Sequence, residues 1–161
     1  TKLDDVIMRT VSLVESRLYK QKIDLETALQ PDLPKVLADY QQIEQVLVNL
    51  VFNAIDAMPD GGKLTIAAQT ARRNGRSSMM LSVSDTGVGI DNESMSKIFL
   101  PFYTAGKKRG LGLGLSICER IVKNHRGRLE VESCVGGGTT FKFYLPLYHE
   151  PMESRESAML S

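Results

Sequence analysis

Asn49-Leu-Val-Phe-Asn53-Ala-Ile-Asp56 is followed in the chain by two glycine-rich stretches, Asp85-Thr-Gly87-Val-Gly89-Ile90 and Gly110-Leu-Gly112-Leu-Gly114-Leu115. Each stretch alone is weak evidence. In this order they supply amide groups on a helix, a carboxylate before a glycine turn, and a glycine loop that opens a helix. These are the groups that a protein needs to hold a nucleotide and its metal ion, so we take them as one candidate site.

The first stretch lies in a segment that we expect to be a helix from Tyr40 to about Ala57, with Asp39 as its N-cap. Its packing face comprises Ile43, Val46, Leu47, Leu50, Val51, Ala54 and Ile55. A separate polar stripe, about 80° wide, comprises Gln42, Gln45, Asn49, Asn53 and Asp56. Surface helices usually carry Lys and Glu at such positions. The amides either hydrogen-bond a neighbouring loop or ligate a hard cation such as Mg²⁺ beside phosphates.

The second stretch follows a predicted strand that ends at Asp85. A carboxylate at a buried strand end can accept a hydrogen bond from an exocyclic amine, and the glycines Gly87 and Gly89 let the backbone pass close to a flat ring. The alternative is a plain turn, in which Asp85 forms an Asx-turn and the glycines supply positive φ angles.

The third stretch follows three adjacent cations, Lys107, Lys108 and Arg109. Glycines before a helix start direct free N–H groups and the positive end of the helix dipole toward an anion. The spacing matches neither the Rossmann nor the P-loop pattern. A flexible linker with a solvated run of charges is therefore the alternative interpretation.

Composition excludes several other classes. The 161 residues suit one domain, and 20 basic against 19 acidic residues give a net charge of +1, so we expect no nucleic-acid partner and no membrane contact. The two cysteines, Cys118 and Cys134, lack metal spacing and are interpreted as reduced packing thiols. His125 lies at a predicted helix end and His149 in a polar tail, and neither has the neighbours of a nucleophilic site.

The remaining pattern predicts a mixture of helices and strands. Helices are expected at residues 1–18, 93–98 and from 112 or 113 to 124, and strands at 23–29, 63–70, 79–85, 128–133 and 139–145, with a short strand at 36–38. A polar loop is expected at 72–78, and residues 149–161 are expected to be a disordered tail after one domain spanning 1–148. This order favours an α/β two-layer sandwich (α+β), a mixed, largely antiparallel sheet covered by helices on one face.

The stretches resemble the conserved boxes of one known family. Residues 49–57 look like the N box of sensor histidine kinases, 85–90 like the G1 box, 98–102 like the F box and 110–115 like the G2 box. Residues 138–141 resemble the closing Gly-Thr strand, so the resemblance covers about residues 5–146. It implies the Bergerat fold of the GHKL superfamily, which binds ATP beneath a mobile lid.

The resemblance also implies roles for individual residues. Asn53 would ligate Mg²⁺ with Asn49 assisting at the phosphates, and these two are the candidate catalytic residues. Asp85 would bind the adenine amine, Gly87 and Gly89 would make room for the ring, and Thr139 would support the adenine. The phosphate loop would be formed by Gly110, Gly112 and Gly114. The expected ATP-binding set further includes Asp56, Ile90, Phe102, Lys107, Lys108 and Leu113.

The activity implied is transfer of the ATP γ-phosphoryl group to a histidine on a dimerisation domain, in two-component signal transduction. The phosphoacceptor segment of the family, a His followed by an acidic residue on a dimerising helix hairpin, is not found in this chain. The isolated domain is therefore expected to be a cytoplasmic monomer that does not phosphorylate itself. Its expected partners are the phosphoacceptor domain and, indirectly, a response regulator receiver domain.

Two alternatives stay open at this point. GHKL ATPases of the gyrase, chaperone and mismatch-repair kind resemble this chain, but they carry a water-activating Glu four residues before the metal Asn. Here that position holds Asn49, and a neutral amide cannot take a proton. The second alternative is a module that senses a nucleotide without catalysis.

Overall fold

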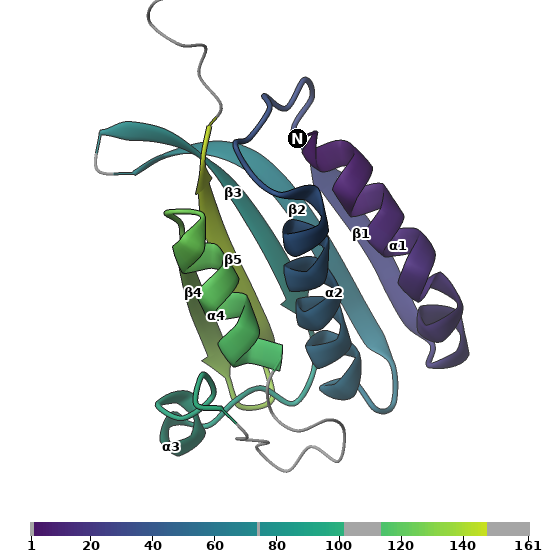
Figure 1. Cartoon of the computed structure of the whole chain (residues 1–161). Helices are drawn as coiled ribbons and strands as arrows, with labels where there is room; N and C mark the ends of the chain where they lie inside the picture. The colour runs from purple at the N-terminus through teal and green to yellow at the C-terminus, as the bar shows by residue number, and fades with distance from the viewer. Residues whose placement is uncertain (1, 74, 102–113, 148–161) are drawn as a thin grey trace, which may run out of the picture.

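One mixed sheet of five strands forms the body of the molecule, and α1, α2 and α4 lie together on one face of it (Figure 1). The computed structural model describes residues 2–73, 75–101 and 114–147. The helices are α1 (Leu3–Lys20), α2 (Tyr40–Asp56), α3 (Asn92–Met95) and α4 (Gly114–Asn124). The strands are β1 (Ile23–Leu29), β2 (Gly62–Arg73), β3 (Arg76–Asp85), β4 (Arg128–Cys134) and β5 (Gly138–Pro146). The predicted fold class is confirmed.

The sheet has the order β1-β2-β3-β5-β4, in which only the β1–β2 pair is parallel. Its register brings apolar residues into line across the strands. Ile66 lies opposite Val83, Val83 opposite Phe141, and Phe141 opposite Val131. Because side chains alternate between the faces of a strand, this register directs one continuous apolar surface toward the helices.

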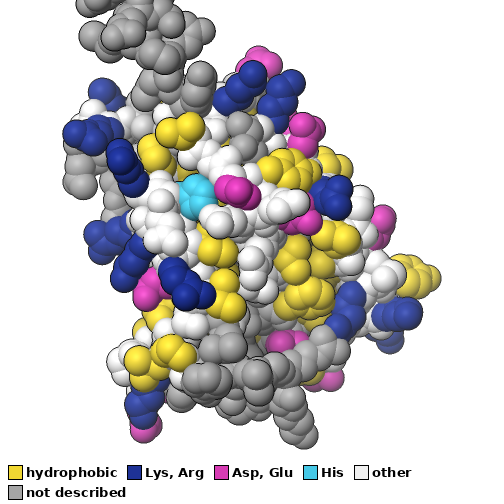
Figure 2. Space-filling view, in the orientation of Figure 1, with side chains coloured by type: hydrophobic (Ala, Val, Ile, Leu, Met, Phe, Trp, Pro, Cys, Tyr) yellow, Lys and Arg dark blue, Asp and Glu magenta, His cyan; other side chains and the backbone are white. Residues whose placement is uncertain are grey.

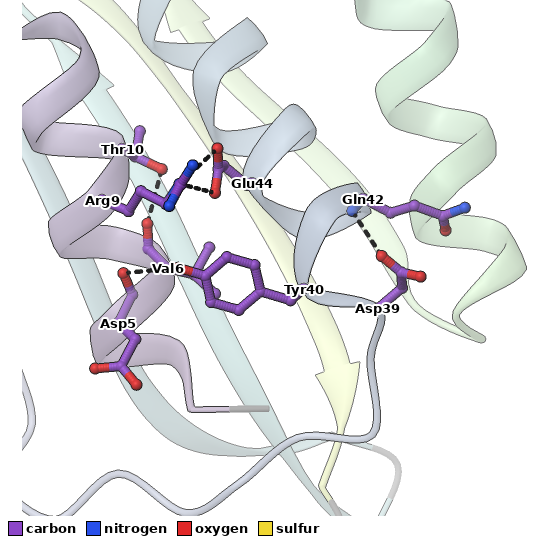
Figure 3. Close-up of polar contacts among 8 residues, drawn as sticks. All are labelled: Asp5, Val6, Arg9, Thr10, Asp39, Tyr40, Gln42 and Glu44. Atoms are coloured by element: carbon purple, nitrogen blue, oxygen red, sulfur yellow. Dashed lines mark hydrogen bonds and ion pairs between the residues drawn. The ribbon is translucent and has the colours of Figure 1, made fainter.

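Helix α2 lies at the centre of the core. Its buried residues are Ile43, Val46, Leu47, Leu50, Val51, Ala54 and Ile55, the same seven that the periodicity predicts. The side chain of Asp39 accepts a hydrogen bond from the backbone N–H of Gln42 at 3.0 Å, so the predicted N-cap is also confirmed (Figure 3). Both the buried face of α2 and the residue that caps it therefore agree with the prediction.

A ladder of polar contacts joins α1 to α2 at a constant offset of 35 residues. The hydroxyl of Tyr40 donates to the carbonyl of Asp5 at 3.4 Å, and Arg9 forms an ion pair of 3.1 Å with Glu44 (Figure 3). Eight residues further along both helices, the guanidinium of Arg17 lies 5.9 Å from the ring centroid of Phe52. Each step advances by four or eight residues, so the two helices run parallel with i, i+4 rows in contact.

At the C-terminal ends of α1 and α2, Gln21, which follows α1, joins the two helices. Its amide nitrogen donates to the carbonyl oxygens of Ile55 at 2.7 Å and Met58 at 3.0 Å. Both carbonyls also accept a backbone N–H, from Met58 and from Gly61 respectively, so Gln21 adds a second hydrogen bond to each where the chain leaves α2. The end of α2 that carries Asn53 and Asp56 is thereby tied to the α1–β1 turn.

Three local expectations are corrected by the structure. The predicted loop at 72–78 is instead the tip of the β2–β3 hairpin, where Arg72 pairs with Ser77 and Gly75 takes a φ of +77°. Backbone pairing continues there because it does not depend on apolar side chains. Val36 forms only an isolated bridge with Leu147, and α3 ends at Met95 because the chain then turns to bury Ile98.

The surface charge is unevenly spread although the net charge is small. On the helix-covered face, Lys and Arg side chains gather along the α4 and β4 side of the molecule (Figure 2). Exposed basic residues of this side are Arg120, Lys123, Arg126 and Arg128. Within the described ranges, no helix is both long enough and apolar enough to span a membrane.

Candidate functional site

The site is built around the carboxylate at the end of β3. Asp85 is 8% exposed, and its Oδ1 accepts hydrogen bonds from the backbone N–H groups of Gly87 at 2.9 Å and Thr139 at 3.2 Å. The first bond is the Asx-turn of the alternative interpretation, although of Gly87 and Gly89 only Gly89 takes a positive φ. The second bond comes from the neighbouring strand β5. Together they hold one buried carboxylate in a fixed orientation at the end of the central strand of the sheet.

The glycines after Asp85 are required by close backbone contacts. A Cβ atom on Gly87 would lie 2.2 Å from the carbonyl oxygen of Ala57, directly after α2. One on Gly89 would lie 2.1 Å from the carbonyl oxygen of Cys134, and Gly89 also has a φ of +78°. The backbone N–H of Val88 donates to the carbonyl of Ala57 at 2.9 Å. These glycines therefore let the turn lie tightly between the end of α2 and the β4–β5 hairpin.

A pair of hydroxyl groups lies beside Asp85. Thr139 is the register partner of Asp85 and is 5% exposed, and its Oγ1 lies 2.7 Å from Oγ of Ser133 on β4. The Ser133 hydroxyl also accepts the backbone N–H of Ile90 at 2.7 Å. Sequence analysis identified Thr139 and Ile90 but missed Ser133. The available signal was its pairing with Thr139 across the predicted hairpin.

The amide stripe of α2 divides into two parts in the structure. Asn49, Asn53 and Asp56 are half-buried, whereas Gln42 and Gln45 are exposed. A Cβ atom on Gly114 would lie 4.0 Å from Cγ of Asn49, so Asn49 lies beside the first residue of α4. The packing of α2 against α4 thus places the Asn49 amide beside the N-terminal, positive end of the α4 dipole.

Asn49 also contacts a buried thiol. Cys118 on α4 is fully buried, and its Sγ donates to the carbonyl of Val46 at 3.7 Å. Burial raises the pKa of Cys118 to about 12 from an ordinary value of 9.0, and a hydrogen bond from the Asn49 side chain opposes that rise. The thiol is therefore protonated at neutral pH and serves packing between α2 and α4.

This environment makes a prediction about thiol reactivity. At pH 8 the folded protein should give one fast-reacting thiol with a disulfide reagent, Cys134, because that residue is exposed. Unfolding in denaturant should release the second thiol, Cys118. Cys134→Ser should abolish the fast phase, and a fast phase that survives this substitution would show that α4 opens readily.

His125, the histidine within the described residues, has a structural role, as predicted. Nδ1 of His125 lies 2.8 Å from the carbonyl of Ile121, and Nε2 accepts the backbone N–H of Asp39 at 3.1 Å. Since Nε2 accepts, the proton resides on Nδ1. The end of α4 is thereby joined to the N-cap of α2.

Several predicted site residues lie outside the described part of the chain: Phe102, Lys107, Lys108, Gly110, Gly112 and Leu113. Their roles stay predictions. Within the described residues, no cluster of three or more His, Cys, Asp or Glu side chains could hold a metal ion. A metal at this site would therefore depend on amide oxygens and on oxygens of a bound ligand, a donor set that suits Mg²⁺.

Comparison with known proteins places these features in one family. Residues 38–149 match the family described as histidine kinase-, DNA gyrase B-, and HSP90-like ATPase. The adaptive-response sensory kinase SasA of Synechococcus elongatus is 37% identical over 154 residues, which are 92% of this chain and 38% of SasA. The chain thus spans less than half the length of this relative.

Two solved structures support the same assignment. Full-length ShkA in complex with AMPPNP superposes with a TM-score of 0.81 at 27% identity, covering 93% of this chain and 31% of ShkA. Histidine kinase ThkA in complex with the response regulator protein TrrA gives a TM-score of 0.76 at 33% identity, covering 92% of this chain and 41% of ThkA. The chain belongs to the histidine kinase-, DNA gyrase B- and HSP90-like ATPase family, as a histidine kinase catalytic domain of two-component systems.

Proposed function

We propose that this domain binds Mg-ATP and transfers the γ-phosphoryl group to a histidine of a separate phosphoacceptor domain. The observation that carries the proposal is the arrangement around the end of α2. Three kinds of group lie near the C-terminal half of α2: the buried carboxylate of Asp85 on β3, the half-buried amides of α2 itself, and the first residue of α4. These three elements supply different chemistry, and each suits a different part of a nucleotide.

The adenine would bind at Asp85. Its Oδ1 already accepts two backbone N–H groups, so the carboxylate is held in place before a ligand arrives. A pre-oriented buried acceptor loses little entropy when it accepts the exocyclic amine of a base. The AMPPNP bound to full-length ShkA, a structural relative, supports an adenine nucleotide as the ligand.

The phosphates and the metal would bind between α2 and α4. Asn53 would ligate Mg²⁺, and Asn49 would contact the phosphates beside the N-terminal N–H groups of α4. The donor set fits this metal, because amide oxygens and phosphate oxygens are hard ligands. When bound, the ion supplies charge neutralisation for the transferring phosphoryl group.

The contribution of this chain to catalysis is positioning and electrostatic stabilisation. Phosphoryl transfer leaves little covalent chemistry for the protein. Asn49 occupies the place where related ATPases carry a Glu, and its neutral amide cannot activate water. The nucleophile is then a histidine of a partner domain. A response regulator would accept the phosphoryl group next, as the complex of ThkA with TrrA suggests for a relative.

Radiolabelled ATP tests this proposal. The domain alone should hydrolyse ATP very slowly and should carry no label on His125, since both ring nitrogens of this residue are engaged. Addition of the matching phosphoacceptor domain should produce acid-labile label on that partner only. A partner domain whose phosphoacceptor His is replaced by Gln is the control. Rapid hydrolysis by the domain alone would contradict the proposal and favour a water-activating ATPase.

A further inference from the structure

The hydroxyl of Ser133, the register partner of Thr139, contacts three groups beside the Asp85–Thr139 pair. It accepts the backbone N–H of Ile90 at 2.7 Å, donates to the carbonyl of Gly138 at 3.1 Å, and lies 2.7 Å from Oγ1 of Thr139. Ser133 itself belongs to β4 and is half-buried. It therefore connects the turn after Asp85 to the β4–β5 hairpin through a single oxygen atom.

Counting protons determines the direction of the contact between the two hydroxyls. A serine hydroxyl has one proton and two lone pairs. If that proton goes to Gly138, then Thr139 must donate to Ser133, and all three contacts of Ser133 are hydrogen bonds. If the proton goes instead to Thr139, the carbonyl of Gly138 loses this donor. The first arrangement forms one hydrogen bond more and is favoured.

In the favoured arrangement the only hydroxyl proton of Thr139 is used in the hydrogen bond that Thr139 donates to Ser133. Its Oγ1 can then only accept hydrogen bonds on its other side. Thr139 is the register partner of Asp85, and both side chains are nine-tenths buried on the helix-facing side of the sheet. The corner therefore offers a carboxylate and a hydroxyl that both act as acceptors.

We propose that Ser133 is a specificity-determining positioning residue, which keeps Thr139 in the acceptor state and so selects a 6-amino purine over a 6-keto purine. This inference rests on the proposed binding of adenine at Asp85. An exocyclic amine has two protons to donate, whereas a 6-keto oxygen is itself an acceptor. The two acceptors, the carboxylate of Asp85 and the hydroxyl of Thr139, leave a keto group without a donor, and a buried unpaired acceptor is costly.

The test compares ATP with inosine triphosphate, whose purine carries a 6-keto group, by calorimetry on the domain. Wild type should bind ATP much more tightly. Ser133→Ala frees the Thr139 proton for donation to the ligand, so the ratio of the two Kd values should fall by about tenfold. Ser133→Thr keeps a hydroxyl and should retain the ratio. Ser133→Val has the shape of the Thr variant but lacks the hydroxyl, so it should behave like the Ala variant.

A matched control is present on the other face of the same strands. The hydroxyls of Ser84 and Thr140 lie 2.9 Å apart, one residue from Asp85 and Thr139 but directed away from the helices. Ser84→Ala should leave the ratio unchanged.

The possible outcomes separate the two proposals. Equal weakening of ATP and inosine triphosphate by Ser133→Ala and Ser133→Val would show a purely structural role and overturn the inference. So would a strong preference for ATP that both variants retain. Failure of the wild-type domain to bind either nucleotide would overturn the proposed function, and the inference with it.

Discussion

Asp85→Asn is expected to weaken ATP binding by about 2 kcal/mol, roughly 30-fold in Kd, without unfolding the domain. Oδ1 of the new amide can still accept the N–H groups of Gly87 and Thr139, which hold the side chain in its present orientation. The amide nitrogen then replaces the second carboxylate oxygen. A donor would face the donor of the adenine amine, so the loss exceeds that of one neutral hydrogen bond.

Calorimetry with ATP and a thermal melt measure the two parts of this prediction. Asp91→Asn is the matched control, because Asp91 caps α3 by accepting the N–H of Ser94 at 2.6 Å and is exposed. Asn caps a helix as well as Asp does, so both stability and ATP affinity should be unchanged there. Unaltered ATP affinity in a folded Asp85→Asn domain would remove this carboxylate from the site.

The centre of the fold could be predicted because its signals are local. The packing face of α2 repeats at helical spacing from Ile43 to Ile55, and the helix follows the capping Asp39, so both the helix and its buried side follow from the sequence. The strands alternate or form short apolar runs, and their order excludes a purely parallel sheet. The observed mixed sheet, parallel only between β1 and β2, agrees with that prediction.

The errors arose where backbone pairing overrides side-chain pattern. Residues 72–78 are polar, and the sequence pattern predicts a loop there, yet Arg72 pairs with Ser77 in the β2–β3 hairpin. An antiparallel ladder satisfies backbone N–H and C=O groups whatever the side chains are. Val36 shows the reverse case, in which an apolar residue is buried by a single bridge to Leu147 rather than by a strand.

The candidate site residues could be selected from the sequence, but the contacts that support them could not. Asp85 and the amides of α2 could be identified as unusual residues for their positions. The contacts of Ser133 with Ile90 and of Asn49 with Gly114 join segments 43 and 65 residues apart, and no local pattern encodes them. The glycines are an intermediate case: the need for small residues was visible, but the backbone atoms they approach, Ala57 and Cys134, were not.

Asn53→Ala is expected to reduce phosphotransfer to the partner domain on the order of a hundredfold. It should also weaken the binding of Mg-ATP far more than the binding of adenosine. The side chain of Asn53 is half-buried on the last turn and a half of α2, with its Nδ2 atom fully buried. If its oxygen ligates the metal, its removal affects only ligands that carry the metal. Adenosine lacks phosphates, so its affinity reports the adenine corner alone.

Helix damage is the main alternative explanation for such a loss, and the substitution itself argues against it. Ala is a better helix former than Asn by about 0.6 kcal/mol, so α2 should not be weakened by the change in propensity. Gln45→Ala removes an amide from an exposed position of the same helix and should leave both ligands unaffected. Equal losses for Mg-ATP and adenosine in Asn53→Ala would mean that the change has disturbed the corner around Asp85. Asn53 would then be a packing residue, and the metal would depend on Asn49 and on the phosphates themselves.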